Sequence, residues 1–416
     1  MDRITHIRIK NVRAIEDLDL ELSPTVTVLI GENGSGKSTI IECLELLRRA
    51  AEPSFMEQFY AIHRGMPGLL RNGARGLQLT VIIEDDHGQR QPLGYTFGLA
   101  RRGSGAVVQG ELLIEHDITR RKSSRALVRS AGQHQMRSSE SGELGAVPNG
   151  MVTPEQLTIG ALAAQPPGSP FHRLLNALRG IEVHLGLDTL AEWAGQAIRR
   201  SSPMRGSTLL RPARRLDLLG HNLASAWHEL KNRGSDHWNE TLGLVRLGLG
   251  QHIDTVIVAV DAGGGQGALS LKQVDSDETI PAANLSDGQL TWLAFVALAR
   301  LSGGRSLLAI DEPERHLHPA LLGRVMALLT ELEGGPQVVL GTHSDRVLEL
   351  LDDPASAIRV CSLEGGRAVV SRLDPNELPR WLEQFGDMGQ LRASGYLPRV
   401  LVPTAPAPSE ALEDGQ

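Results

Sequence analysis

Cysteine is almost absent from this chain of 416 residues, which has only Cys43 and Cys361, far apart and in no metal-ligand spacing. Long apolar runs are also lacking, since no segment approaches the roughly 20 residues that a membrane-spanning helix needs. The charged start, MDRITHIRIK, does not resemble a secretory signal. These absences argue against a disulfide-stabilised secreted domain and against a membrane protein. We therefore expect a protein of the reducing cytoplasm that reaches a membrane only through a partner.

Lysine is scarce as well, providing five of the 42 basic residues, and the net charge is −7. The total charge therefore does not indicate a nucleic-acid partner. However, residues 118–139 and 199–215 each hold six basic residues and no acid, and without these twelve charges the rest carries −19. We expect these blocks to contact DNA or another anionic partner; the alternative is a general bias toward arginine in loops. The arginines expected to make this contact are Arg120, Arg121, Arg125, Arg211, Arg214 and Arg215.

Apolar strands alternate with helical segments at both ends of the chain, which predicts an α/β fold with a parallel or mixed sheet covered on both faces. Residues 4–22 have the alternation typical of a pair of edge strands. An antiparallel sheet is predicted from three further segments, 77–85, 93–100 and 105–116. No heptad pattern lasts over several turns, so a long coiled-coil arm is not expected.

The middle of the chain has a different character. Residues 118–169 are polar, basic and rich in Gly, Ser and Pro, which favours loops, whereas 170–250 favours helices. The helical segments predicted there are 171–185, 187–200 and 222–233. The units expected from these patterns are 1–117, an N-terminal lobe with an antiparallel β subdomain; 118–169, a basic loop-rich insertion; 170–250, a helical subdomain; 251–403, a C-terminal lobe; and 404–416, a disordered tail.

A phosphate-binding loop is predicted at residues 31–38. The stretch GENGSGKS follows an apolar strand, opens a helix and fits the spacing G-x-x-x-x-G-K-[ST] through Gly31, Gly36, Lys37 and Ser38. Glycines let backbone N–H groups converge on a phosphate, and the helix N-terminus adds positive potential. Lys37 would contact the β- and γ-phosphates, and the Ser38 hydroxyl would join the Mg²⁺ shell. A merely flexible glycine loop is the alternative, but it would not need the lysine.

An acid pair, Asp311 and Glu312, ends the apolar strand of SLLAIDEPERHLHP. Asp311 is placed to hold Mg²⁺ through water, and Glu312 to accept a proton from attacking water; two solvated carboxylates in a turn are the alternative. His343 ends a neighbouring strand, VVLGTHSD, from which its ring would reach a γ-phosphate, although such a histidine is usually a polar cap. His316 and His318 lack the spacing for one helix face and a nearby third ligand, so a metal site is not expected there.

A second anion site is predicted where NLSDGQLTWLAF opens a helix. Ser286 and Gln289 fit a helix capping box, which is the purely structural interpretation. A helix N-terminus with Ser and Gly at its tip is also an anion site, and it has a use if it completes the nucleotide site of another protomer.

Taken in order, GENGSGKST, LSDGQ, LLAIDEP and GTHSD resemble the Walker A, signature, Walker B and switch-histidine motifs of ABC-type ATPases. DEPERHLHP and the opening IRIKNVRAIEDLDLEL are similar to the RecF, OLD and SMC-like branch. The ending DPNELPRWLEQFGDMGQLRASGYLP resembles stand-alone AAA-family ATPases of that branch, many from phage-defence operons. The resemblance covers roughly 1–115 and 250–397, without a long coiled coil and without room for a Toprim nuclease domain.

This resemblance implies an ATP- and Mg²⁺-dependent ATPase of the P-loop NTPase class that works as a homodimer or higher oligomer. Glu312, Lys37 and His343 would act in catalysis, and Ser38 and Asp311 would hold the metal. The residues implied to contact nucleotide are Gly31, Asn33, Gly34, Ser35, Gly36, Lys37, Ser38, Thr39 and Arg13 in one subunit, and Ser286, Gly288 and Gln289 from the opposite one. Asp287 replaces the commoner glycine of the signature. A Mg²⁺-sensing glutamine is either Gln156 or Gln165.

The function expected from these motifs is a nucleotide switch whose two copies enclose two ATP molecules head to tail. Its output would go to DNA or to a separate effector protein such as a nuclease, in DNA repair or antiviral defence. Two alternatives stay open. The first is the ATP-binding subunit of a transporter, against which the absence of a DEPTSALD continuation argues. The second is a regulatory module that holds ATP without hydrolysing it, which the intact Asp311–Glu312 pair disfavours.

Overall fold

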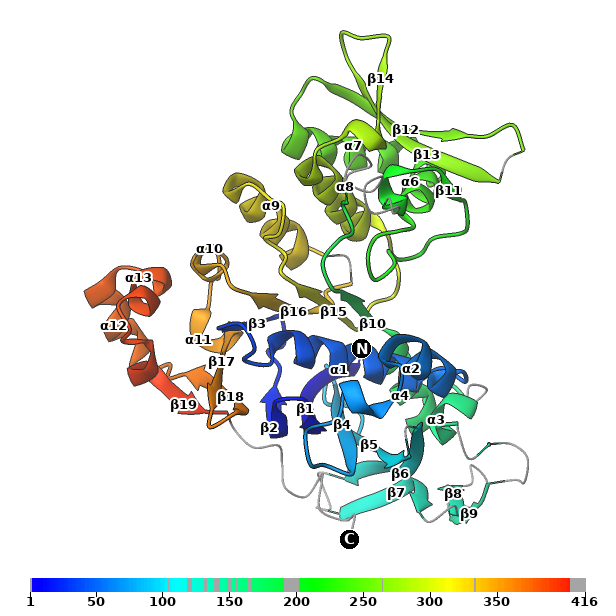
Figure 1. Cartoon of the computed structure of the whole chain (residues 1–416), viewed down its shortest axis with the longest axis vertical. Helices are drawn as coiled ribbons and strands as arrows, with labels where there is room; N and C mark the ends of the chain where they lie inside the picture. The colour runs from blue at the N-terminus through cyan, green and yellow to red at the C-terminus, as the bar shows by residue number, and fades with distance from the viewer. Residues whose placement is uncertain are drawn as a thin grey trace.

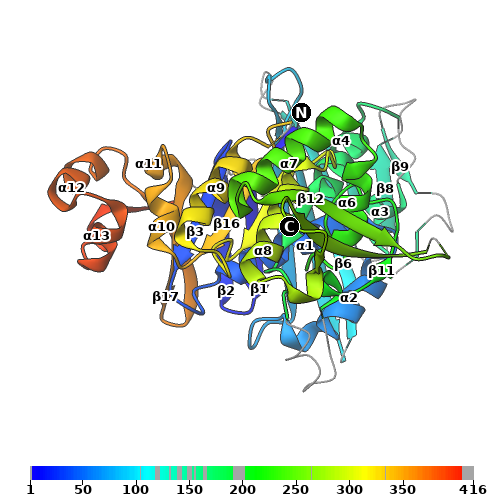
Figure 2. The same cartoon turned by 90° about the horizontal axis from the view of Figure 1, so that it is seen from above.

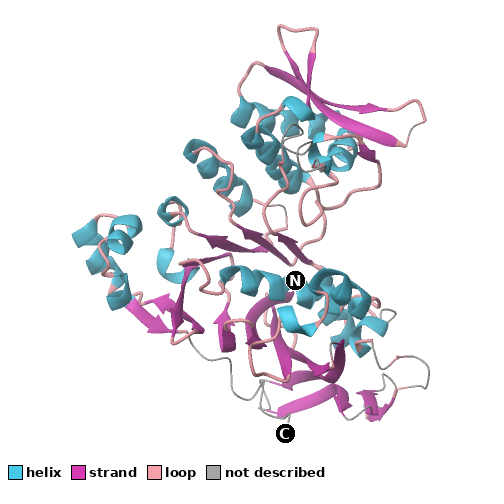
Figure 3. Cartoon of the chain, in the orientation of Figure 1, coloured by secondary structure: helices cyan, strands magenta, loops and turns pink. Residues whose placement is uncertain are grey.

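The structure is a computed structural model that describes residues 2–404 except for 104, 118–121, 131–132, 138–142, 148–151, 154–155, 163–165, 191–201, 264 and 333. It has a central sheet, an antiparallel sheet below it and a helical lobe above it in the view of Figure 1. Figure 3 shows that strands and helices contribute to all three parts. Among the described helices, none combines the length and apolar character needed to cross a membrane.

The central sheet has seven strands, of which the first five are parallel; the sixth is antiparallel to the fifth, and the seventh is antiparallel to the sixth. Their spatial order is β10 (Ile181–His184), β15 (Leu307–Asp311), β16 (Gln337–Thr342), β3 (Val26–Gly31), β17 (Ile358–Glu364), β18 (Arg367–Leu373) and β19 (Leu401–Pro403). All residues of β3 and β16 are buried, as is expected for strands covered on both faces. The predicted α/β fold with a mixed sheet is therefore confirmed.

Two hydrophobic cores lie on opposite faces of this sheet, because successive side chains of a strand point to opposite sides. In β15, Leu307 and Ala309 belong to the core with α1 (Lys37–Ala50), whereas Leu308 and Ile310 belong to the core with α8 (Asp287–Arg300). The first core also contains residues of the antiparallel sheet, so α1 lies between the two sheets (Figure 1). The second core contains α9 (Pro319–Thr330).

The antiparallel sheet has eight strands and corrects two sequence-based expectations. The order is β2 (Ile15–Glu21), β1 (Asp2–Val12), β4 (Gly76–Asp85), β5 (Leu93–Arg102), β6 (Gly105–Asp117), β7 (Lys122–Ser130), β8 (Gln133–Arg137) and β9 (Leu144–Ala146). β1 is not an edge strand, since it pairs with both β2 and β4. The described residues of the insertion are not mainly loop, because β7 pairs with β6 and buries Ala126 and Leu127. Sheet pairing here overrides a local composition that favours loops.

A third correction concerns the predicted helix 171–185, which is split into α4 (Pro170–Arg179) and strand β10. Gly180 ends the helix in close contact with the next strand, since a Cβ there would lie 2.5 Å from Ser306 Oγ. β10 pairs with β15, which is far away in the sequence, and a local helical pattern gives no information about such a long-range contact. In the predicted helix 187–200, residues 187–190 are not helical and the rest lie outside the described residues.

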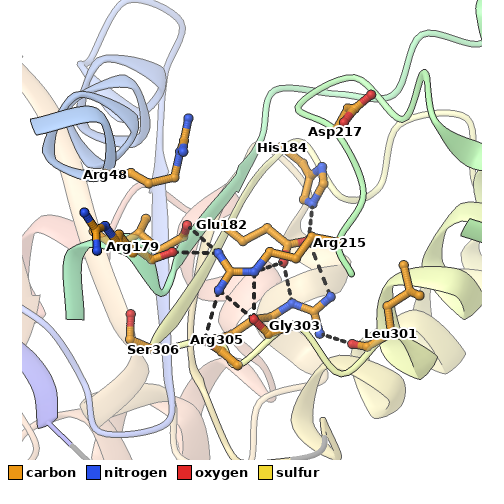
Figure 4. Close-up of polar contacts among 12 residues, drawn as sticks. Arg48, Arg179, Glu182, His184, Arg215, Asp217, Leu301, Gly303, Arg305 and Ser306 are labelled. Carbon is orange, nitrogen blue, oxygen red and sulfur yellow. Dashed lines mark hydrogen bonds and ion pairs between the residues drawn. The ribbon is translucent and has the colours of Figure 1, made fainter. Parts of the chain in front are cut away.

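β10 is the edge of the central sheet, and a buried group of charges holds it in place (Figure 4). Glu182 accepts a hydrogen bond from Arg305 Nε at 2.5 Å and contacts His184 Nε2 at 3.0 Å. Arg215 Nε lies 3.7 Å from the same carboxylate and also donates to the Gly303 carbonyl at 3.0 Å. These interactions join the edge strand to the loop before β15 and to the segment around Arg215.

The helical lobe contains α6 (Leu223–Lys231), α7 (Ser235–Leu249) and α8, with a small sheet of β11 (Thr208–Leu209), β13 (Gln266–Gln273), β12 (Ile253–Val260) and β14 (Thr279–Pro281). Helix α6 lies within the predicted segment 222–233.

At the opposite end of the molecule, the helices α12 (Leu378–Phe385) and α13 (Met388–Ala393) protrude from the body in Figures 1 and 2. α13 packs on α10 (Asp345–Glu349), which follows β16; α11 (Pro354–Ala357) precedes β17. α2 (Phe55–His63) and α3 (Thr158–Ala161) lie beside α1 and α4. Of the predicted disordered tail, 404–416, all residues after Thr404 lie outside the described part.

Candidate nucleotide site

The glycine loop leads from β3 into α1, as the sequence predicts. Gly34 and Gly36 have φ angles of 81° and 103°, in the left-handed region that glycine tolerates. Gly36 caps α1 without a side-chain hydrogen bond to the helix, which leaves the first N–H groups available to an anion. Gly31 is required by close packing, since a Cβ there would lie 2.0 Å from the Cys361 carbonyl oxygen.

Lys37 is the cation of this loop and is only 4% exposed. Its Nζ donates hydrogen bonds to the carbonyl oxygens of Gly31 at 2.8 Å and Glu32 at 3.0 Å. Burial lowers the pKa of Lys37, because the charged form is removed from water without a directly bonded anion. The Ser35 hydroxyl is also buried and has no hydrogen-bond partner in the part of the chain that the structure describes. A loop with a desolvated cation and an unsatisfied hydroxyl fits a phosphate group.

Asp311 ends β15, and its side chain forms a hydrogen bond with that of Ser38, the second residue of α1. Burial raises the pKa of Asp311, and the nearby Glu312 carboxylate raises it further, although the Ser38 hydrogen bond opposes this effect. A buried carboxylate next to a hydroxyl is a donor set that suits Mg²⁺, which prefers few protein oxygens and the substrate's phosphates. Within the described residues, no group of three or more His, Cys, Asp or Glu forms a metal site of its own.

Glu312 follows Asp311 in a strained turn, with a φ angle of 53° that few non-glycine residues adopt. Its backbone N–H donates to the Gly341 carbonyl at 2.7 Å, which fixes the turn against β16. Among the described residues, no partner hydrogen-bonds or ion-pairs with the Glu312 carboxylate. Strain of this kind persists at sites where the fold holds a side chain in a required direction. The carboxylate of Glu312 is therefore available to a water molecule at the site.

His343 follows β16, and its position is set by Glu314, a residue that the sequence analysis missed. Glu314 Oε1 accepts hydrogen bonds from Thr342 Oγ1 at 2.7 Å and from the His343 backbone N–H at 3.0 Å. Glu314 Oε2 is buried without a partner. The position of Glu314 two residues after Glu312 was the available signal, because acids that follow a strand end often bond the neighbouring strand end.

Arg392 of α13 is a second missed residue. Its Nη1 donates to Asp345 Oδ1 at 2.6 Å and to the His343 carbonyl oxygen at 3.4 Å. Its positive charge is among the influences that lower the pKa of Lys37, after the larger effect of burial. The protruding C-terminal helices thus bring a cation to the nucleotide site. No local sequence pattern indicates this, because Arg392 is 49 residues from His343.

The signature corner at the start of α8 forms the predicted capping box. Ser286 Oγ accepts from the Gln289 backbone N–H at 3.2 Å, and Gln289 Oε1 accepts from the Ser286 N–H at 2.9 Å. Ser286 is exposed and Gly288 partly so, which leaves the tip accessible to a second molecule. His318 caps α9 in a similar way, accepting from the Ala320 N–H at 3.3 Å, so a structural role accounts for it.

Several other predicted residues have partners of their own. Arg13 forms an ion pair with Glu42 of α1 at 2.5 Å, beside the loop helix. Gln156 accepts from the Thr153 N–H at 3.3 Å, and its carbonyl oxygen accepts from Arg129 next to β7. Gln165 lies outside the described residues. The geometry therefore does not choose between the two glutamines.

The arginines that the sequence predicts to contact DNA also differ in their surroundings. Arg120 and Arg121 lie outside the described residues, Arg125 is in β7, and Arg211 and Arg214 are exposed. Arg215 corrects the expectation, because its guanidinium donates to the carbonyl oxygens of Arg179 at 2.8 Å and Gly304 at 2.9 Å and supports the β10 edge. It is a structural residue rather than one free to contact DNA.

Residues 26–349 match the family described as AAA domain, putative AbiEii toxin, Type IV TA system. The chain is 36% identical over 62 residues to the DNA replication and repair protein RecF of Corynebacterium jeikeium, covering 15% of each protein. It is 39% identical over 51 residues to the OLD nuclease of Thermus scotoductus, covering 12% of this chain and 10% of that protein. The chain thus matches only a small part of the length of either relative.

Among solved structures, the SmcHead bound to the C-winged helix domain of ScpA superposes with a TM-score of 0.53 at 12% identity, covering 91% of this chain and 99% of that chain. This likeness shows a shared fold. Together with the family match, it confirms the resemblance to the RecF, OLD and SMC-like ATPases.

Proposed function

The chain belongs to the family of AAA domains described as putative AbiEii toxin, Type IV TA system, and from this premise we propose that it hydrolyses ATP with Mg²⁺ in a head-to-tail dimer. The observation that supports this proposal most strongly is the meeting of Lys37, Asp311 and Glu312 at one edge of the central sheet. Lys37 and Asp311 influence each other's pKa, and Asp311 bonds Ser38 at the start of α1. The phosphate-binding loop, the acid proposed to hold the metal and the proposed base are thus close together.

The roles follow from the surroundings of each residue. The free N–H groups at the start of α1 and the Lys37 ammonium bind the phosphates, while Ser38 and Asp311 hold Mg²⁺, which neutralises charge on the β- and γ-phosphate oxygens. Glu312, with no competing partner, takes a proton from the attacking water. Glu314 holds the backbone N–H of His343 at the end of β16, and His343 lies near enough to influence the pKa of Asp311, so its ring is proposed to contact the γ-phosphate.

A single subunit leaves the signature corner without a ligand, and the proposed dimer supplies one. Ser286, Gly288 and Gln289 close over the nucleotide held by the partner subunit, as a helix N-terminus suits a γ-phosphate. Hydrolysis then removes the bridging phosphate and opens the dimer, so the protein works as a switch.

The test is the variant Glu312→Gln, which keeps the shape of the base but removes its proton-accepting charge. We expect the turnover number to fall by about 10² to 10⁴-fold, the usual contribution of a general base. We also expect a stable dimer with ATP and Mg²⁺ in light-scattering measurements after gel filtration. Glu331→Gln, at an exposed position at the end of α9, is the matched control. A Glu312→Gln protein that stays monomeric at saturating ATP overturns the dimer mechanism.

Phosphate release, co-purification and DNA binding separate the alternatives. A regulatory module that binds ATP without turnover shows no phosphate release from the wild-type protein. A transporter subunit instead co-purifies with a membrane protein and ignores DNA.

For the output we propose DNA, or an effector that acts on it, by analogy with the names of the RecF and OLD nuclease relatives. Arg211 and Arg214 are the exposed arginines that support this choice. The double variant Arg211→Glu/Arg214→Glu should weaken DNA binding and flatten its salt dependence, because each lost phosphate contact reduces counterion release. Arg346→Glu/Arg367→Glu, with two exposed arginines on α10 and β18, is the control. Salt-independent binding by the wild-type protein contradicts the DNA proposal.

A further inference from the structure

Asp287 occupies the signature position at which the related ATPases commonly have glycine, and its carboxylate contacts two separate segments. Oδ1 lies 2.7 Å from Arg205 Nη2, and Oδ2 lies 3.9 Å from His316 Nδ1. Arg205 belongs to the segment before the small sheet, and His316 to the turn that follows β15. One carboxylate therefore bridges the helical lobe and the acid-bearing turn within a single subunit.

Arg205 fixes the position of the signature corner at the start of α8. Its side chain is only 4% exposed, and Nε donates to the Thr189 carbonyl oxygen at 2.9 Å. Nη1 donates to the carbonyl oxygens of Ala283 at 3.1 Å and Leu285 at 2.6 Å. The planar guanidinium thus holds the backbone that leads into α8 and, through Nη2, the side chain of its first residue.

His316 connects the corner to the turn that carries Glu312. Its φ angle is 64°, so both Glu312 and His316 adopt the left-handed conformation in this short turn. The His316 carbonyl oxygen is 3.0 Å from the position of a Cβ on Gly288, so the turn and the corner approach closely. Glu312 and His316 also line one small cavity with Thr291 and Phe295 of α8, so the turn and this helix face each other.

We propose that Asp287 is a positioning residue that couples the two nucleotide sites of the dimer. It ties the corner, which closes over the partner subunit's nucleotide, to the turn that holds Glu312 for the subunit's own nucleotide. When the corner moves onto the partner's γ-phosphate, the Asp287–His316 contact carries the movement to Glu312. This inference rests on the proposed head-to-tail dimer and adds a link between its two half-sites.

The decisive experiment uses heterodimers with different affinity tags on the two protomers. One protomer carries Glu312→Gln, which binds ATP without hydrolysing it, so that hydrolysis comes only from the other protomer. Asp287→Gly is then placed in the hydrolysing protomer, where its corner faces the inactive site. Coupling through the subunit's own turn predicts that hydrolysis falls at least about fivefold, within the range of measured interaction energies between contacting residues. Unchanged hydrolysis in this arrangement overturns the proposal.

Four further variants separate positioning from folding. His316→Ala in the hydrolysing protomer should reproduce the loss, and adding Asp287→Gly should cause little more, because the two residues act through one contact. Asp287→Glu should restore most of the activity. Asp277→Gly, at an exposed acid of the same lobe, should have no effect. Nucleotide affinity and melting temperature should stay at wild-type values in all of them, and a general fall in either contradicts a specific coupling role.

Failure of the two proposals is distinguishable. If Glu312→Gln homodimers do not form with ATP, the dimer mechanism and the coupling both fall. If these homodimers form but the Asp287→Gly heterodimer hydrolyses ATP normally, only the coupling falls.

Discussion

Gly341 and Asp311 stand opposite each other in the parallel pair of β16 and β15, and a Cβ placed on Gly341 would lie 2.5 Å from Asp311 Oδ1. The same Cβ would lie 2.8 Å from Ile41 Cδ1 of α1. The absence of a side chain at Gly341 therefore leaves the space that the Asp311 carboxylate occupies.

The variant Gly341→Ala tests this relationship. The added methyl group must displace Asp311, and a displacement of about 1 Å at a reacting site can reduce the rate by about 10²-fold. We expect a loss of this order in Mg²⁺-dependent ATP hydrolysis. Gly323→Ala in α9 is the control, because a Cβ there meets only Leu350 at an ordinary 3.9 Å. Wild-type hydrolysis by Gly341→Ala shows that the Asp311 position is not critical.

The raised pKa of Asp311 predicts how Mg²⁺ use depends on pH. Only the ionised carboxylate binds the metal, and burial makes Asp311 accept a proton at higher pH than an exposed aspartate does. As the pH falls below neutrality, the Mg²⁺ concentration for half-maximal hydrolysis should therefore rise. Titrations of activity with Mg²⁺ at a series of pH values measure this effect. Equal Mg²⁺ requirements at every pH contradict it.

The grouping of the candidate site residues was largely predictable because their motifs are local. Lys37, Ser38, Asp311 and Glu312 lie in short segments whose strand and helix context is readable from the sequence, and the structure places them together. Arg392 was not predictable in this way, because only the packing of α13 on α10 brings it to His343.

The fold was predictable where period and burial agree, as in β3, β15 and β16. Prediction failed at β10, because a segment of four residues is too short for its pattern of apolar residues to distinguish a strand from the end of a helix. It also failed at β7, since a strand with several polar residues is stabilised by its neighbour β6 rather than by its own composition.

The buried charge of Glu182 should stabilise the edge of the central sheet (Figure 4). Glu182→Gln leaves the buried Arg305 without its counter-charge, which typically costs about 3–5 kcal/mol of unfolding free energy. Glu240→Gln is the control, because this acid is 68% exposed beside Arg300 and such pairs contribute at most about 1 kcal/mol. Urea unfolding of both variants measures the difference. Equal losses contradict a structural role for the buried group.

The pH dependence of the same group has a definite sign. Burial raises the pKa of Glu182, but the hydrogen bond from His184 and the charges of His184 and Arg305 outweigh it, so the net pKa lies below the ordinary value. Such a carboxylate stabilises the fold above its unfolded-state pKa, and the stabilisation is lost as the pH falls through its folded-state pKa. The unfolding free energy of the wild-type protein should therefore decline at acidic pH more steeply than that of Glu182→Gln.

Arg392→Ala tests the contact between the C-terminal helices and the nucleotide site. The ion pair with Asp345 is partly exposed, so its removal should cost at most about 1 kcal/mol of stability. Loss of the cation near Lys37 and His343 should instead lower the turnover number about tenfold, as expected for a hydrogen bond to a charged group. Arg346→Ala, which breaks an exposed pair with Glu349 on α10, is the control. Arg392→Lys should recover part of the rate, and an Arg392→Ala protein with normal turnover contradicts the role.

The order of strands in the central sheet also has a consequence for biosynthesis. β3, near the start of the chain, pairs with β16, which ends at Thr342. At a translation rate of roughly 5–20 residues per second, about 15 to 60 s pass between the emergence of these two strands. During that interval the apolar β3 has no partner on this side, so the nascent protein depends on protection from aggregation. A polypeptide released before Thr342 is made contains the glycine loop but lacks the complete strand that pairs with β3.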